Sequence, residues 1–193
     1  MNNLYQDIFR NIKEYLDYNE FLSLCYLNKN NYNECKKIKF LKLNSDYSSL
    51  YYYSEEFRNK VLNCVISKYQ LSLKLIKLKD KIIDANVFKG IHTLEIIKCK
   101  TIKNIHSLSN LHTLKIVSNS FSDVSSLGKI HYLTLASCNR IDDVSSLSNV
   151  NKLDLLYCPH IRDCSMLNNV KKLKVIACDC DNINHFIIFN FSK

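Results

Sequence analysis

The sequence predicts an α+β chain in which a small helical module precedes a solenoid of parallel strands. The first observation is a pattern of about 20 residues that returns five times in residues 91–178. The second is a helical period in residues 4–16, where apolar side chains recur at steps of three and four. We therefore divide the chain into a helical module (1–37), a linker and cap (38–70), and repeats with an irregular C-terminal cap (71–193).

Each copy of the repeat begins with a leucine, at spacings of 20, 19, 20 and 20 residues. These leading leucines are Leu94, Leu114, Leu133, Leu153 and Leu173. A second aliphatic column stands two residues later: Ile96, Ile116, Leu135, Leu155 and Val175. This alternation predicts a half-buried strand, and the later apolar residues of each copy fill the inside of one coil. One coil cannot bury its apolar residues alone, so neighbouring coils stack around a shared core.

A third column follows each strand and holds Cys99, Asn119, Cys138, Cys158 and Cys178. A small side chain fits there because it can bond to buried backbone as the chain leaves the strand. With this column, the copy HYLTLASCNRIDDVSSL (131–147) resembles a leucine-rich repeat. A degenerate copy opens the array with Leu73, Leu75, Leu78, Ile82, Ala85 and Phe88.

The resemblance implies that parallel strands line a concave face, which offers the side chains between the buried leucines to a partner. The expected target-binding residues are Glu95, Ile97, Lys115, Val117, Tyr132, Thr134, Lys152, Asp154, Leu156 and Lys174. An apolar stripe beside charged residues is typical of an interaction surface. The alternative is that the apolar column turns partly inward and packs against its neighbours; this column is Ile97, Val117, Ala136, Leu156 and Ile176.

The first 37 residues carry two or three expected short helices that are too small to form a core alone. The stretch LYQDIFRNIKEYLDYNEFLSLCYLNKNNY (4–32) resembles an F-box, although Tyr5 stands where that family usually has proline. The resemblance implies binding to a Skp-type adaptor protein. The implied contact residues are Leu4, Tyr5, Ile8, Phe9, Ile12, Leu16, Phe21, Leu24 and Leu27.

The segment 38–70 has weaker signals, and we expect it to shield the first coil, since terminal repeats need a cover. Leu41 and Leu43 suggest a short strand, residues 47–53 a tyrosine-rich loop, and a helix is expected from about Ser54. After Cys178 the pattern decays, and Phe186, Ile188 and Phe189 are expected to fold over the last open edge.

Together the two resemblances imply the substrate-recognition subunit of a Skp–cullin–F-box ubiquitin ligase. Its chemistry would be done by the recruited conjugating enzyme, so the chain itself is expected to be non-catalytic. The composition and repeat style are similar to those of F-box and leucine-rich repeat proteins of giant DNA viruses that infect amoebae, in which case the adaptor would be the host's. The alternative is a repeat scaffold with no ubiquitin role, in which the Ile8, Ile12 and Leu16 face packs on the cap.

Composition argues against several other classes of protein. The net charge is +9, yet the lysines are scattered, which disfavours a nucleic-acid-binding patch. No apolar run is long enough to span a membrane. Nine cysteines without a secretory signal predict a reducing compartment, cytoplasmic or nuclear, in which they stay as thiols.

We expect no metal and no cofactor. A zinc site would draw on Cys158, His160, Cys164, Cys178, Cys180 and His185, whose spacing lacks paired C-x-x-C units. His92, His112 and His131 recur in one column, which indicates solvent-facing repeat residues rather than a catalytic set. No catalytic triad, paired carboxylates or glycine-rich phosphate loop is present.

Overall fold

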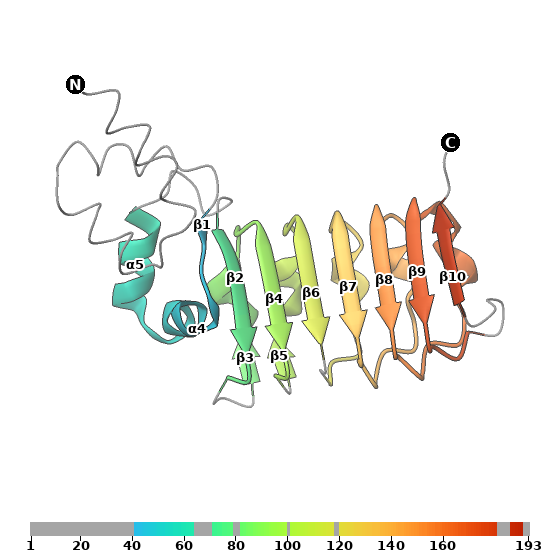
Figure 1. Ribbon diagram of the computed structural model, residues 1–193, viewed down its shortest axis with the longest axis horizontal. Helices are drawn as coiled ribbons and strands as arrows, with labels where there is room; N and C mark the ends of the chain where they lie inside the picture. Colours follow the sequence, from blue (N-terminus) through green and yellow to red (C-terminus); the bar gives the residue numbers. More distant parts are fainter. Residues whose placement is uncertain are drawn as a thin grey trace, which may run out of the picture.

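A computed structural model describes residues 41–63, 71–78, 82–99, 101–117 and 120–180, together with the backbone of 186–190. Its main feature is an eight-stranded sheet whose strands lie side by side along the molecule, with the 3₁₀ helices behind them (Figure 1). The strands are β1 (Leu41–Lys42), β2 (Leu71–Ile76), β4 (Thr93–Ile97), β6 (Thr113–Val117), β7 (Tyr132–Ala136), β8 (Lys152–Leu156), β9 (Lys172–Ile176) and β10 (Phe186–Asn190). The expected helices within residues 4–27 lie outside the described residues.

The repeat pattern sets the register of this sheet. Strands β2, β4, β6, β7, β8 and β9 pair in parallel in that order. The leading leucines stand opposite one another, and Leu73 of β2 stands opposite Leu94. They and the second aliphatic column are buried as one continuous core, for example Leu114, Leu133 and Leu135 at 0 to 1% exposure. The parallel solenoid expected from the repeat is therefore confirmed.

Each coil returns behind the sheet through a short 3₁₀ helix. These helices are η2 (Ala85–Phe88), η3 (Ile105–Leu108), η4 (Ser125–Leu127), η5 (Ser145–Leu147) and η6 (Ser165–Asn169). Asp123, Asp143 and Asp163 each accept a hydrogen bond from the backbone N–H two residues on, at 2.8 Å. Asp84 does the same for Asn86 at 3.0 Å, so an aspartate caps most of these turns.

The chain leaves most strands through a residue with positive φ. Lys77, Lys98, Ser137, Tyr157 and Ala177 have φ between 48° and 58°. In four of these turns the next residue is a buried cysteine whose thiol donates to the carbonyl of the last strand residue, at 3.5 to 3.7 Å. The expected bond between a small side chain and buried backbone is thus confirmed for Cys99, Cys138, Cys158 and Cys178.

The first coil differs from its expected form. Ile82 is 44% exposed, whereas Ile83 is buried. The reason is a second, two-stranded sheet in which β3 (Ile82–Asp84) pairs with β5 (Thr101–Lys103), so that Ile83 stands opposite the buried Ile102. Placing Ile82 in the core was therefore wrong by one residue.

The segment before the repeats forms a strand and two helices. Strand β1 pairs in parallel with β2, and helix α5 (Glu55–Asn63) begins after Ser54 as expected. The expected tyrosine-rich loop is wrong, because residues 45–53 form helix α4 (Ser45–Tyr53). The Asn44 side chain accepts the N–H groups of Asp46 and Tyr47 and so caps this helix.

Helix α4 is anchored to the first repeat strand. Ser48 is fully buried; its hydroxyl donates to the Leu43 carbonyl at 3.2 Å and accepts the Lys74 N–H of β2 at 2.9 Å. Tyr51 is also buried, and burial raises the pKa of its phenol to about 12. At the other end of the sheet, the backbone of β10 pairs antiparallel with β9, which covers the strand edge as expected for the C-terminal cap.

Candidate functional site

The outward side of the repeat strands forms one continuous surface, which we call the strand face. Successive residues of a strand point to opposite sides, so every second residue of β4, β6, β7, β8 and β9 joins it. Its lysine column is Thr93, Thr113, Tyr132, Lys152 and Lys172; its middle column is Glu95, Lys115, Thr134, Asp154 and Lys174. Its apolar stripe is Ile97, Val117, Ala136, Leu156 and Ile176.

All ten residues expected to contact a target lie on the strand face. The structure places three further residues, which were not in that set, beside Tyr132, Lys152 and Asp154. Thr113 and Lys172 share the lysine column with Lys152, so the repeat register itself could have indicated them. Asn151 precedes β8 and has no such signal.

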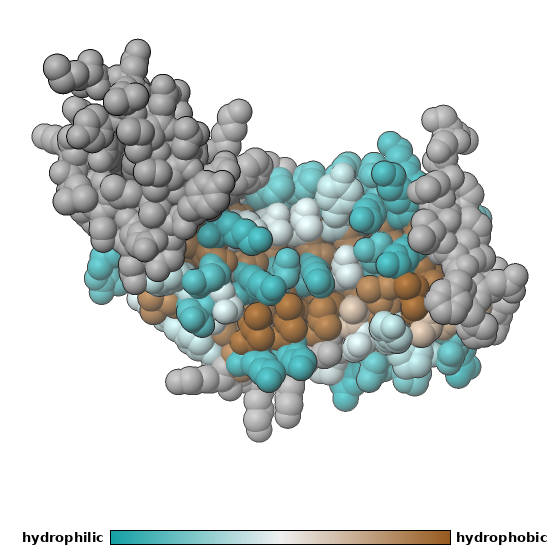
Figure 2. All heavy atoms as spheres, viewed as in Figure 1, coloured by the Kyte–Doolittle hydropathy of each residue, from teal (hydrophilic) through white to brown (hydrophobic). Residues whose placement is uncertain are grey.

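The apolar stripe is open to a partner along most of its length. Ile97, Val117, Leu156 and Ile176 are half-buried, and only Ala136 is buried, at 8% exposure. Ala136 therefore packs inward, while the four larger residues pack partly against their neighbours and keep part of their surface exposed. Figure 2 shows apolar side chains gathered in a band across the strands, with hydrophilic side chains beside it.

The charges of the strand face are unbalanced. Lys74 of β2 forms an ion pair with Glu95 at 3.7 Å, and Thr134 donates to Asp154 at 3.4 Å. Lys115, Lys152, Lys172 and Lys174 have no ion pair with any residue that the structure describes. Both acidic groups of the face thus have partners, while four ammonium groups are available to a ligand.

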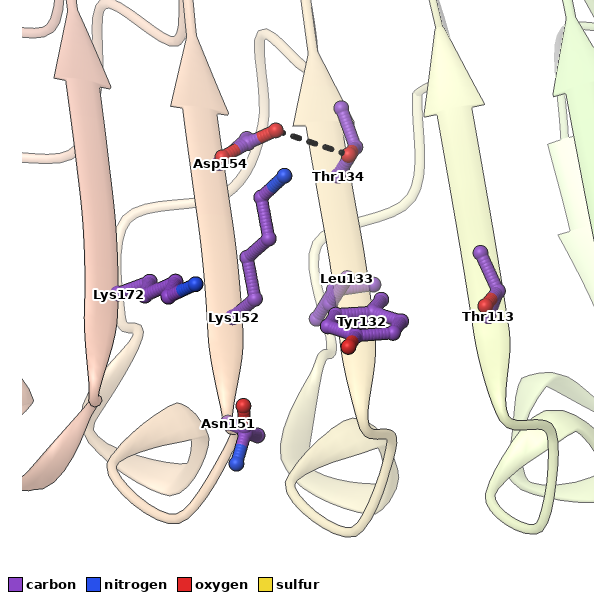
Figure 3. A pocket seen from close by; sticks show the side chains of 8 residues that line it. All are labelled: Thr113, Tyr132, Leu133, Thr134, Asn151, Lys152, Asp154 and Lys172. Carbon is purple, nitrogen blue, oxygen red and sulfur yellow. Dashed lines mark hydrogen bonds between the residues drawn. The ribbon is translucent and has the colours of Figure 1, made fainter.

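Two of these lysines border a pocket of about 390 Å³ over β6 to β9. Figure 3 shows Lys152 lying along the strand face toward Thr134 and Asp154, with Lys172 beside it on the next strand. Tyr132 and Thr113 lie on the other side of the pocket, and Asn151 lies at the start of β8. The pocket therefore offers ammonium, hydroxyl and amide donors, with Asp154 as a single acidic group.

Three histidines border the strand face where β4, β6 and β7 begin. The rings of His92 and His112 stack with centroids 4.5 Å apart, and those of His112 and His131 lie 4.8 Å apart. The Tyr132 ring meets His131 edge-on at 4.5 Å. Burial and then the neighbouring histidine lower the pKa of His92 and of His112, which favours neutral imidazoles. The expected solvent-facing histidines are thus half-buried in a stack.

The cysteines differ in part from expectation. Cys164 and Cys180 form a disulfide, so the prediction that every cysteine stays a thiol is wrong for this pair. Cys99, Cys138, Cys158 and Cys178 are buried thiols. A hydrogen bond with Cys138 and burial raise the pKa of Cys158 to about 11, and a hydrogen bond with Cys158 raises the pKa of Cys178. Such thiols are poor nucleophiles and poor metal ligands.

Within the part of the chain that the structure describes, no three His, Cys, Asp or Glu side chains lie close enough together to hold a metal ion. Nor does any helix within the described ranges have the length and apolar character needed to cross a membrane.

Parallel strands in register are joined through five 3₁₀ helices, and four of the strands are followed by a buried cysteine. This is the kind of solenoid that leucine-rich repeats build. No protein-family model matches the sequence, and no curated protein matches it. Among solved structures, the chain is similar to an internalin of Listeria monocytogenes strain 4b F2365, with 23% sequence identity and a TM-score of 0.40. The match covers 53% of this chain and 36% of the internalin chain.

Proposed function

We propose that this protein is a non-catalytic interaction scaffold that binds a protein partner through its strand face. The supporting observation is the apolar stripe, which is half-buried on one side of the sheet, while the inward side chains of β2, β4, β6, β7, β8 and β9 are buried. Apolar residues flanked by charged ones are typical of protein interfaces. A sheet held in register by a continuous core presents these side chains in a fixed arrangement, which lowers the entropic cost of binding.

Selection from a display library of random peptides tests this proposal. The full chain is immobilised and binders are enriched, then compared on two variants. Leu156→Asp places a charge in the apolar stripe, and Ile82→Asp makes the same kind of change at an exposed isoleucine of β3, off the strand face. Binders lost with Leu156→Asp and kept with Ile82→Asp support the proposal. Binders unaffected by Leu156→Asp, with folding checked by circular dichroism, contradict it.

A finer proposal assigns the scaffold to a ubiquitin ligase. Its support is the F-box-like spacing in residues 4–32, which lie outside the described part of the structure. In this proposal the module binds a Skp-type adaptor, the host's if the chain is viral, and the strand face holds the protein to be modified. The chain then works in the cytoplasm or nucleus, where such ligases act.

Titration of the full chain with a purified Skp-type adaptor tests the finer proposal. We expect saturable binding that the double change Ile8→Asp and Leu16→Asp abolishes and that Leu156→Asp leaves intact. A folded wild-type chain that does not bind the adaptor removes the ligase role. The scaffold proposal would then stand alone, with the N-terminal helices as part of its cap.

A further inference from the structure

The strand face carries more positive than negative charge. Four lysines without described ion-pair partners lie on the strand face, two of them in the middle column and two in the lysine column. The capping carboxylates of Asp123, Asp143 and Asp163 lie at the start of the 3₁₀ turns, which are behind the sheet (Figure 1). The strand face therefore attracts negative charge.

This attraction is concentrated at Lys152 and Lys172. The two lysines stand directly opposite each other on β8 and β9, and like charges in that position repel. Both border the pocket described above, together with the hydroxyl of Tyr132 and the amide of Asn151. A carboxylate bound between the two ammonium groups removes the repulsion and gains charge-assisted hydrogen bonds.

The distance between the columns limits which ligand shapes can contact both the lysine column and the apolar stripe. Two residues along a strand span roughly 6.7 Å, so the lysine column and the apolar stripe each lie about that far from the middle column. An extended peptide running across the strands along the middle column has alternate side chains on its two sides. One set then faces the lysines and the other faces Val117, Leu156 and Ile176.

Strand spacing is compatible with this arrangement. Neighbouring strands are about 4.8 Å apart, while alternate side chains of an extended peptide are about 6.7 Å apart. The flexible stems of Lys152 and Lys172 can absorb this difference. The polar middle column, with Thr134, Asp154 and Lys174, faces the peptide backbone.

We propose that the strand face binds an extended partner segment in which acidic and apolar residues alternate, with a carboxylate seated between Lys152 and Lys172. This inference rests on the proposed function, because it names the chemistry of the partner on the same surface. The segment crosses β6 to β9 and places its apolar side chains on the stripe.

Fluorescence anisotropy with the full chain and a labelled decapeptide of alternating Asp and Leu tests the inference. We expect saturable binding that weakens with added salt. Peptides of alternating Ser and Leu, Asp and Ser, or Lys and Leu should each bind at least about tenfold more weakly. Each of them lacks either the acidic side chains that face the lysines or the apolar side chains that face the stripe.

Two variants with equal charge change locate the site. Lys152→Glu with Lys172→Glu reverses the paired lysines, and Lys89→Glu with Lys129→Glu reverses two exposed lysines in turns between a 3₁₀ helix and the next strand. We expect about a tenfold or greater loss of affinity for the first pair. Only a small change is expected for the second. Equal losses for both pairs would overturn the proposed site.

The remaining outcomes separate this inference from the proposed function. One outcome is that the library yields strand-face binders without acidic residues and that the Asp–Leu peptide does not bind. This outcome overturns the inference and leaves the scaffold role intact. If the library yields no binder that Leu156→Asp weakens, both this inference and the proposed scaffold function are overturned. An oligonucleotide that binds more tightly than the peptide, and depends on Lys152 and Lys172, overturns the inference in favour of a nucleic-acid ligand.

Discussion

At the scale of single residues, the repeat imposes a left-handed backbone on side chains that ordinarily avoid it. Ser137, Tyr157 and Ala177 each directly follow a strand and have φ of 52°, 55° and 50°. This conformation costs a non-glycine residue roughly 1–2 kcal/mol. The chain has two glycines in total, and neither is used at these turns, so no glycine signal in the sequence marks them.

Replacing one of these residues with glycine should therefore stabilise the fold. Ser137→Gly removes the φ cost and adds the entropy cost of glycine, for an expected gain of about 0.5 kcal/mol in the free energy of unfolding. Ser148→Gly is the matched control, since this half-buried serine has φ −56° and should lose about 0.5–1 kcal/mol. Urea unfolding measures both, and equal effects at the two positions would contradict the argument.

Gly128 is required for space rather than for its φ, which is −64°. A Cβ atom there would overlap the carbonyl oxygen of Ser146 in the next coil. We expect Gly128→Ala to push the two coils apart and to cost about 1–3 kcal/mol of stability. Ser148 occupies the same place one coil later and already carries a Cβ, so Ser148→Ala should change stability by less than about 0.5 kcal/mol. Thermal unfolding of both variants decides whether Gly128→Ala is the more harmful change.

At the scale of elements, the aspartates that precede η4, η5 and η6 couple the fold to pH. Hydrogen bonds from Ser125 lower the pKa of Asp123, and those from Ser145 and Ser165 lower the pKa of Asp143 and Asp163. A carboxyl whose pKa is lower in the folded state stabilises the fold above its unfolded pKa. That contribution is lost as the pH falls through the folded value.

We predict that the triple change of Asp123, Asp143 and Asp163 to Asn flattens the acid side of the stability curve. Asparagine keeps an oxygen acceptor for the turn and does not titrate in this range. The wild-type protein should lose stability from about pH 4 downward, and the variant should lose less over the same interval. Urea midpoints measured between pH 3 and 7 test this, and single changes should give partial effects. Parallel curves for the two proteins would contradict the prediction.

The elements show what the sequence could and could not predict. Strands and their register followed from the leucine columns, because every coil buries the same positions. Helix α4 was missed because its tyrosines carry no clear helical period, and its anchor is the contact of Ser48 with β2. Ile82 was misplaced because the pairing of β3 with β5, and not the repeat spacing, decides which of its residues is buried. On the strand face, the columns indicated the residues, while the pocket depended on Asn151, which only the fold brings there.

At the scale of the whole molecule, stability is distributed along one dimension. Strands β2, β4, β6, β7, β8 and β9 each pair with two neighbours in the main sheet, with β1 and α4 at one end and β10 at the other (Figure 1). In such arrays stability is approximately a sum over coils and over the interfaces between neighbouring coils. A substitution in a central coil should therefore weaken its neighbours more than distant coils.

Leu135→Ala tests this distribution of stability. Leu135 is fully buried in β7, between Ile116 of β6 and Leu155 of β8, so its truncation leaves a cavity and should cost about 2–5 kcal/mol. Native-state hydrogen exchange should show the largest loss of protection in β6, β7 and β8, with a smaller loss in β2, which α4 anchors through Ser48. Thr134→Ala, on the strand face of the same strand, is the control and should leave protection nearly unchanged. An equal loss in β2 and β7 would instead mean that the solenoid opens only as one cooperative unit, and the one-dimensional description would be wrong for this protein.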